Sequence, residues 1–216
     1  MISRSEGEPL GPRLYIVTPP LADARHLAAN LELLLDAGDV AALLLRATAA
    51  DEALIRRHVD TLAPLTRRRG TALLIEAMPE LAARTAADGV HVPDPGGLSV
   101  ALKVLKPDRI VGAGGLRTRH DAMVGGEMGA DYVMFGEPDI TGCRPGLEAL
   151  LERVAWWAEL FEPPCVGFAT TLDEASGLVA AGADFVAAGD LVWHAADGPA
   201  SGVRALAARL GTRETV

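Results

Sequence analysis

Short apolar runs alternate along this chain with longer segments whose apolar positions recur at helical spacing. The run AALLLR at 41–46 has no polar residue before its final arginine, which is typical of a parallel strand buried on both faces. The longer segments show the i, i+3, i+4 spacing of amphipathic helices. Strands are predicted over 13–18, 41–46, 71–76, 89–92, 109–113, 131–135, 165–169 and 185–188, and helices over 23–36, 51–69 with an interruption at Pro64, 79–87, 98–105, 120–128, 146–161, 172–181 and 201–210.

Four related segments, each with an aspartate just before a strand, indicate an internal repeat. The aspartates are Asp39, Asp88, Asp131 and Asp184, at intervals of 43 to 53 residues. An interval of that length holds two strand–helix units, so four repeats give eight strands and eight helices. This alternation predicts an α/β fold, a (β/α)8 TIM barrel, although an open doubly wound sheet has the same local pattern. We expect an N-terminal tail over 1–12 and a single barrel domain over 13–216.

Composition limits the partners of such a domain. The 216 residues carry a net charge of −9, which opposes binding to nucleic acid or to an anionic membrane surface. No apolar run has the length of a membrane span. The two cysteines, Cys143 and Cys165, form neither a disulfide framework nor a metal-binding spacing, and a cytoplasmic location is therefore expected. Any phosphate site must be local, because the overall charge does not attract phosphate.

The active site of a TIM barrel lies at the C-terminal ends of the strands. Polar residues at the predicted strand ends are the candidates for chemistry: Thr18, Arg46, Glu76, His91, Asp94, the loop 112–115, Glu137, Asp139, Thr141, Arg144, Thr170, Thr171 and Asp190. The loop 136–146 carries the strongest signal, because it is longer and more polar than ordinary connections.

Several of these candidates have two interpretations. Arg46 either binds an anion or forms a structural ion pair. Glu76 is a base, a metal ligand or the partner of Arg46, and an ion pair with Arg46 is the most economical assignment. His91 alternates with two valines, which indicates either a packed core histidine or a catalytic one. Cys143, beside Arg144, is either an activated thiol or a filler.

Four segments resemble the thiamine phosphate synthase family and its relative, the TenI-type thiazole tautomerase. They are RLYIVT at 13–18, AADGVHV at 86–92, GADYVMFG at 129–136 and AGADFVAAG at 181–189. The resemblance extends over nearly the whole chain. The loop TGCRPGLE at 141–148 is more similar to the corresponding loop of the tautomerase than to that of the synthase. The resemblance implies a TIM barrel, a role in thiamine biosynthesis as a transferase or tautomerase, a small-molecule ligand at the C-terminal face, and Mg²⁺ as cofactor.

The resemblance also implies roles for individual residues, although many motif positions differ. In the second-strand motif Gln-x-Arg-x-Lys, which binds pyrophosphate, only Arg46 is kept. The third-strand Asn-Asp becomes Glu76-Ala77, and the second magnesium aspartate falls near Gly96. Glu76 and Asp94 are the candidate metal ligands that remain.

The later loops differ from the family pattern as well. Thr141 and Arg144 match phosphate-binding positions, and Glu137 stands where the tautomerase has its proposed catalytic histidine. The glycine-rich phosphate cradle after the seventh strand becomes GFAT at 167–170, leaving Thr170 and, after the eighth strand, Gly189 as candidate donors. Asp190 replaces a serine beside the phosphate. At about 4 Å it would oppose a phosphate charge by about 4 kcal/mol at an effective dielectric near 20.

Three functions remain open from the sequence. The protein acts on a thiazole phosphate, with or without a pyrimidine pyrophosphate, through Arg46 and Glu137 as catalytic residues. Alternatively, it is a diverged member that binds a less phosphorylated small molecule or has a regulatory or interaction role. In the third interpretation it is a different barrel enzyme with Arg46, Glu76, Glu137 and Asp190 as a new acid–base set. The pair Trp156-Trp157 predicts core and groove packing, with a homodimer contact as the alternative.

Overall fold

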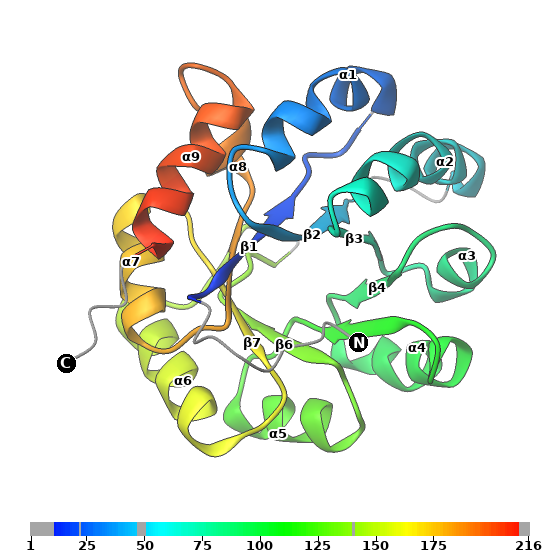
Figure 1. Ribbon diagram of the computed structural model, residues 1–216. Helices are drawn as coiled ribbons and strands as arrows, with labels where there is room; N and C mark the ends of the chain where they lie inside the picture. Colours follow the sequence, from blue (N-terminus) through cyan, green and yellow to red (C-terminus); the bar gives the residue numbers. More distant parts are fainter. Residues whose placement is uncertain (1–10, 22, 47–50, 140, 212–216) are drawn as a thin grey trace.

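Eight parallel strands close into a barrel in order β1 to β8, and β1 also pairs with β8. The structure, a computed structural model, describes residues 11–21, 23–46, 51–139 and 141–211. Figure 1 shows the helices as a ring around the strands. The predicted TIM barrel is therefore confirmed. The predicted tail lies almost entirely outside the described residues, and its conformation stays a prediction.

The strands are short and follow the predicted positions. They are β1 (Arg13–Val17), β2 (Val40–Leu45), β3 (Ala72–Glu76), β4 (Gly89–Val92), β5 (Ile110–Ala113), β6 (Tyr132–Phe135), β7 (Cys165–Phe168) and β8 (Phe185–Ala188). The helices are α1 (Ala24–Leu35), α2 (Glu52–Arg68), α3 (Pro79–Ala83), α4 (Leu98–Leu105), α5 (Arg119–Glu127), α6 (Leu147–Leu160), α7 (Leu172–Ala180), α8 (Asp190–Trp193) and α9 (Pro199–Leu210), with a 3-10 turn at Pro95–Gly97.

Three helix predictions need correction. The helix α2 is not interrupted at Pro64. Both Pro64 and Asp60, whose carbonyl has no N–H partner at Pro64, are exposed residues, where the loss of one backbone hydrogen bond is tolerated. The helix α3 ends at Ala83 rather than at residue 87, and the Arg109 guanidinium binds the carbonyls of Ala82 in the last turn and of Thr85 beyond it. The sequence also gave no indication of α8, which has only four residues.

The apolar residues form two layers, as alternating strand faces require. The larger layer lies between the strands and the helices. The smaller one fills the barrel and includes Tyr15, Leu44, Leu74, Tyr132 and Phe168. Among the described residues, no helix has both the length and the apolar character needed to cross a membrane.

The repeated aspartates bind polar groups at the N-terminal end of the barrel. The Oδ2 atoms of Asp88, Asp131 and Asp184 accept backbone N–H groups from the neighbouring strand, at Leu73 (2.8 Å), Val111 (2.7 Å) and Cys165 (2.9 Å) respectively. Asp39 instead binds the Arg13 guanidinium through both oxygens, each at 2.8 Å. The repeat seen in the sequence is therefore a structural device, because it satisfies polar groups at the start of each strand pair.

Trp157 is fully buried, which confirms core packing for this half of the tryptophan pair. Its ring stacks on Phe161 with centroids 4.2 Å apart, and its indole N–H donates to the Pro163 carbonyl at 2.7 Å. Trp156 is partly buried, with the Arg119 guanidinium over its ring. A homodimer contact stays a prediction.

Candidate active site

Arg46 and Glu76 meet at the C-terminal mouth of the barrel. Arg46 follows β2, and its backbone N–H donates to Thr18 Oγ1 at 3.1 Å. Its Nε lies 3.4 Å from Glu76 Oε1 at the end of β3, so the predicted ion pair is confirmed. The Arg46 side chain is 37% exposed and the Glu76 side chain 17%. Arg46 is therefore neutralised by a neighbour but still reaches solvent, where an anion can approach it.

A line of buried polar groups runs through the barrel to the same mouth. The chain has two tyrosines, and the hydroxyls of Tyr15 and Tyr132 are 2.8 Å apart in the barrel interior. The Tyr132 hydroxyl is 2.9 Å from His91 Nδ1. The other ring nitrogen, His91 Nε2, is 2.8 Å from Glu137 Oε2, and Gly115 N–H donates to Glu137 Oε1 at 3.2 Å.

The direction of these hydrogen bonds follows from their ends. An ionised carboxylate only accepts hydrogen bonds, so His91 Nε2 carries a hydrogen and donates a hydrogen bond to Glu137. Burial, with the charge of Glu137 adding to it, raises the pKa of the Tyr132 hydroxyl, so Tyr132 stays protonated. Tyr132 O–H can then donate to His91 Nδ1 and accept from Tyr15. His91 is thus a buried histidine that orients Glu137, which is 13% exposed at the mouth.

Glycines make room for this line of side chains. A Cβ on Gly112 would lie 1.9 Å from the Tyr132 ring, and one on Gly114 would lie 2.5 Å from His91 Nε2 and 2.6 Å from Glu137 Oε1. Gly136 has φ +82° and turns the chain directly after β6. The loop glycines at 112–115 therefore allow His91 and Glu137 to meet.

The loop after β6 is held together by Asp139. Its Oδ1 accepts the backbone N–H and the hydroxyl of Thr141, at 2.8 and 2.6 Å, and the N–H of Cys143 at 3.0 Å. The Thr141 hydroxyl, followed by these loop N–H groups and the Arg117 charge, lowers the pKa of Asp139. Thr141, predicted to bind phosphate, thus donates its hydroxyl inside the loop.

Arg144 and Thr170 bind each other directly, and both also bind the Glu174 carboxylate. Arg144 Nη1 donates to Thr170 Oγ1 at 2.7 Å and to Glu174 Oε2 at 2.9 Å, and Nη2 donates to the Phe168 carbonyl at 3.0 Å. Burial would raise the pKa of Glu174. The hydrogen bonds from the Thr170 N–H, the Arg144 guanidinium and the Thr170 hydroxyl, with the Arg144 charge, outweigh burial, and the pKa is lowered.

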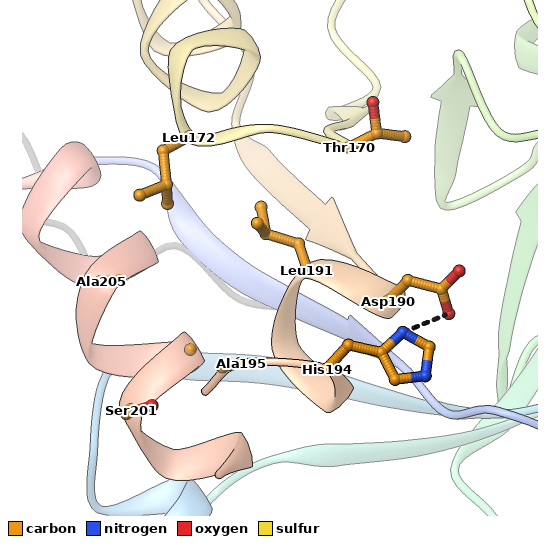
Figure 2. A pocket seen from close by; sticks show the side chains of 9 residues that line it. Thr170, Leu172, Asp190, Leu191, His194, Ala195, Ser201 and Ala205 are labelled. Atoms are coloured by element: carbon orange, nitrogen blue, oxygen red, sulfur yellow. Dashed lines mark ion pairs between the residues drawn. The ribbon is translucent and has the colours of Figure 1, made fainter. Parts of the chain in front are cut away.

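A cleft of 470 Å³ lies beside Thr170, between the first turns of α7, α8 and α9. Figure 2 shows Leu172 and Leu191 among the residues that line it, and Asp190 at the start of α8 beside His194, which follows that helix. Asp190 Oδ1 is 3.9 Å from His194 Nδ1, and the Asp190 side chain is 88% exposed. Because water screens so exposed a carboxylate, the repulsion estimated from the sequence does not apply at full strength. Gly189 is the cap residue of α8 and directly precedes Asp190, which lines the cleft.

The candidate metal ligands have the right chemistry but are not part of a larger cluster. The residues that the structure describes include no group of three or more His, Cys, Asp or Glu side chains arranged to hold a metal ion. Asp94 Oδ1 accepts the Gly96 N–H at 3.2 Å, and Glu76 is paired with Arg46. Each carboxylate keeps a further oxygen, and Mg²⁺ in phosphate-binding sites commonly uses one or two carboxylates with water and substrate oxygens. Both are oxygen donors of the kind that Mg²⁺ prefers, and their role as magnesium ligands stays a prediction.

The sequence interpretation did not identify three residues of this region: Tyr15, Tyr132 and Glu174. Both tyrosines lie on strands of a core built from Ala, Leu and Val, and a buried phenol needs a hydrogen-bond partner, which was an available signal. Glu174 is the third residue of α7 and follows Thr171 at the spacing of a capping box, so it reads as an ordinary helix cap. Its side chain binds Thr170 instead of the cap residue.

Comparison with known proteins agrees with this architecture. The chain is 43% identical over 194 residues to the thiamine-phosphate synthase of Rhodospirillum centenum, covering 88% of this chain and 94% of that protein. It is 39% identical to the synthase of Hyphomonas neptunium, covering 89% and 91%. The structure is similar to a thiamine phosphate pyrophosphorylase from Pyrococcus furiosus, with TM-score 0.75, 24% identity, and coverage of 92% and 95%.

The family description agrees with these relatives. The sequence profile described as thiamine monophosphate synthase matches residues 14–191, which includes all eight strands except the first residue of β1. The mouth described above, from Arg46 after β2 to Asp190 on α8, lies within the matched range. This chain belongs to the thiamine monophosphate synthase family.

Proposed function

We propose that this protein is a transferase of thiamine biosynthesis that acts on a thiazole phosphate at the C-terminal mouth of the barrel and joins it to a pyrimidine pyrophosphate. The observation that carries the proposal is the 43% identity to a thiamine-phosphate synthase over 88% of this chain. The charged groups at the mouth support it, because they suit a reaction that separates charge. Both cysteines are free, which fits a reducing compartment such as the cytoplasm.

In this reaction the thiazole nitrogen bonds to the methylene carbon of the pyrimidine, and the bond from that carbon to the pyrophosphate oxygen breaks. The pyrophosphate leaves with the bonding electrons, and the ring nitrogen becomes positively charged. Arg46 binds the leaving pyrophosphate, whose negative charge grows in the transition state. Glu137 provides negative charge at the mouth, where the methylene carbon and the thiazole become electron-poor, and His91 holds it in place.

The remaining residues bind phosphate or metal in this proposal. Arg144, Thr170 and Gly189 bind the thiazole phosphate in the loops after β6, β7 and β8. Thr141 joins them when its hydroxyl exchanges Asp139 for the phosphate. Mg²⁺ would be held by Glu76 and Asp94, and when bound it neutralises charge on the pyrophosphate. In this proposal the phosphate and magnesium site is degenerate, because several motif positions differ from the family pattern. Arg46 and Arg144 each also face a carboxylate of this chain.

The test is formation of thiamine phosphate from the two substrates with Mg²⁺, followed by its conversion to a fluorescent derivative. We expect turnover by the native chain, and a loss of about 100-fold or more in Arg46→Ala and in Glu137→Gln. Arg68→Ala is the matched control for Arg46→Ala, because Arg68 forms an exposed ion pair with Glu32 on the outer ring and should leave turnover unchanged.

The second substrate distinguishes this function from the tautomerase alternative. If the native chain forms no thiamine phosphate but isomerises the thiazole phosphate, with loss of that activity in Glu137→Gln, the condensation is excluded and Glu137 is a general base. The Mg²⁺ ligands are tested separately by calorimetric titration with Mg²⁺. Binding in the native chain that disappears in Glu76→Gln supports the assignment, and unchanged binding contradicts it.

A further inference from the structure

Three hydrogen-bond donors converge on one carboxylate oxygen after β7. Glu174 Oε2 accepts the Thr170 backbone N–H at 2.7 Å, the Thr170 hydroxyl at 2.9 Å and Arg144 Nη1 at 2.9 Å. The Arg144 and Glu174 side chains are 17% and 16% exposed. A backbone N–H, a hydroxyl and a guanidinium are the donors with which proteins bind a phosphate group. A carboxylate oxygen of this chain thus has the position of a ligand oxygen.

The arrangement leaves one buried donor without a partner. Arg144 Nε is buried and has no hydrogen-bond partner within the described part of the chain. Arg144 binds Glu174 through Nη1 alone, whereas a phosphate with three acceptor oxygens can bind a guanidinium at two nitrogens. A buried polar atom with no partner needs an explanation, and a bound phosphate supplies one.

We propose that Glu174 is an internal competitor that occupies the anion position of the Arg144–Thr170 cradle until a ligand phosphate displaces it. The cradle is the same phosphate site as in the proposed function, so this inference rests on that assignment and explains how the site is controlled. The carboxylate is covalently attached and is therefore always present at high local concentration. Phosphate binds only to the fraction of molecules in which Glu174 has moved away, which weakens its apparent affinity by that fraction.

The alternative is that Glu174 is only a helix cap. The Glu174 N–H donates to Thr171 Oγ1 at 3.1 Å, and that bond belongs to an ordinary cap of α7. The Glu174 side chain does not complete the cap, because it binds Thr170 and Arg144 instead of the Thr171 backbone. A cap role does not explain the contact with the Arg144 guanidinium, while an anion position does.

The experiment is calorimetric titration of inorganic phosphate into the full chain, comparing the native protein with Glu174→Gln. Gln is nearly isosteric and removes the charge, so we expect phosphate to bind about tenfold tighter. Asp173→Asn is the matched control, because it removes one charge from the same helix turn, its side chain is 94% exposed and it lies outside the cradle. We expect this control to change the affinity by less than about twofold.

Two further variants make the result decisive. Arg144→Ala combined with Glu174→Gln should lose the gain in affinity, which would place the phosphate in the cradle. Glu174→Ala replaces Glu174→Gln if the latter unfolds, as judged by thermal denaturation, and should show the same gain. Phosphate binding by Glu174→Gln and Glu174→Ala that is no tighter than that of the native chain overturns the proposal. This measurement needs no turnover. A gain in affinity without thiamine phosphate formation would therefore contradict the proposed reaction and leave the competitor role of Glu174 standing.

Discussion

The two ends of this barrel use carboxylates in opposite ways. At the N-terminal end, Asp88, Asp131 and Asp184 accept backbone N–H groups of the neighbouring strands, and the pattern recurs every second strand. At the C-terminal mouth, carboxylates face cationic or titratable side chains: Glu76 faces Arg46, Glu137 faces His91, and Glu174 faces Arg144. These three follow no repeat.

This difference between the two ends distinguishes carboxylates that stabilise the fold from carboxylates that we propose take part in function. A backbone N–H cannot leave its strand, so an aspartate beside it stabilises one conformation. A guanidinium or imidazole can exchange its carboxylate for a ligand anion or can move a proton. In our proposal the carboxylates at the mouth give way to ligand anions or take part in proton transfer, so substitutions at the two ends should affect different observables.

The largest effect is expected at the mouth, from Gly114→Ala. The new Cβ would lie 2.5 Å from His91 Nε2 and must separate His91 from Glu137. We expect turnover to fall about 100-fold, as for other misplacements of catalytic groups by about 1 Å. Gly146→Ala is the control, since its Cβ meets no atom within 4 Å and the residue has a negative φ. Turnover of Gly114→Ala at the native rate would contradict a role for the His91–Glu137 contact.

A smaller effect, on stability alone, is expected at the N-terminal end from Asp131→Ala. This change leaves the Val111 N–H and the Lys106 ammonium without their acceptor, which should cost about 2 kcal/mol in the free energy of unfolding. The exposed Asp190→Ala should change it by less than about 0.5 kcal/mol. Urea denaturation measures both, and equal costs in the two variants would be evidence against the structural role of the repeated aspartates.

The smallest effect is a pH dependence that comes from Glu174. The hydrogen bonds from Thr170 and Arg144 outweigh burial and lower its folded-state pKa, so its contribution to stability is present above its unfolded pKa of about 4.3 and is lost as pH falls through the folded pKa. The stability difference between the native chain and Glu174→Gln should be about 1 kcal/mol near pH 7 and should shrink below pH 4. A difference that is constant from pH 7 to pH 3 would show that the charge is not involved.

The fold followed from the sequence because buried strands and amphipathic helices have distinct local patterns. The ion pair between Arg46 and Glu76 was also predictable, because these residues stand at the C-terminal ends of two neighbouring strands. The contact between Tyr15 and Tyr132 lay beyond such reasoning, because it joins residues on strands that meet only across the closed barrel. Glu174 had a satisfactory local role as a helix cap, so its contact with Arg144 gave no signal in the sequence.

The most direct test of the whole account is the yield of thiamine phosphate from the native chain, measured beside the Rhodospirillum centenum synthase under identical conditions. We expect product from both proteins, with Mg²⁺ and both substrates required, because we propose that ligand anions displace the carboxylates paired with the cations at the mouth. Product from the Rhodospirillum protein alone would contradict the account, and it would mean that the carboxylates at the mouth of this barrel have closed the synthase site.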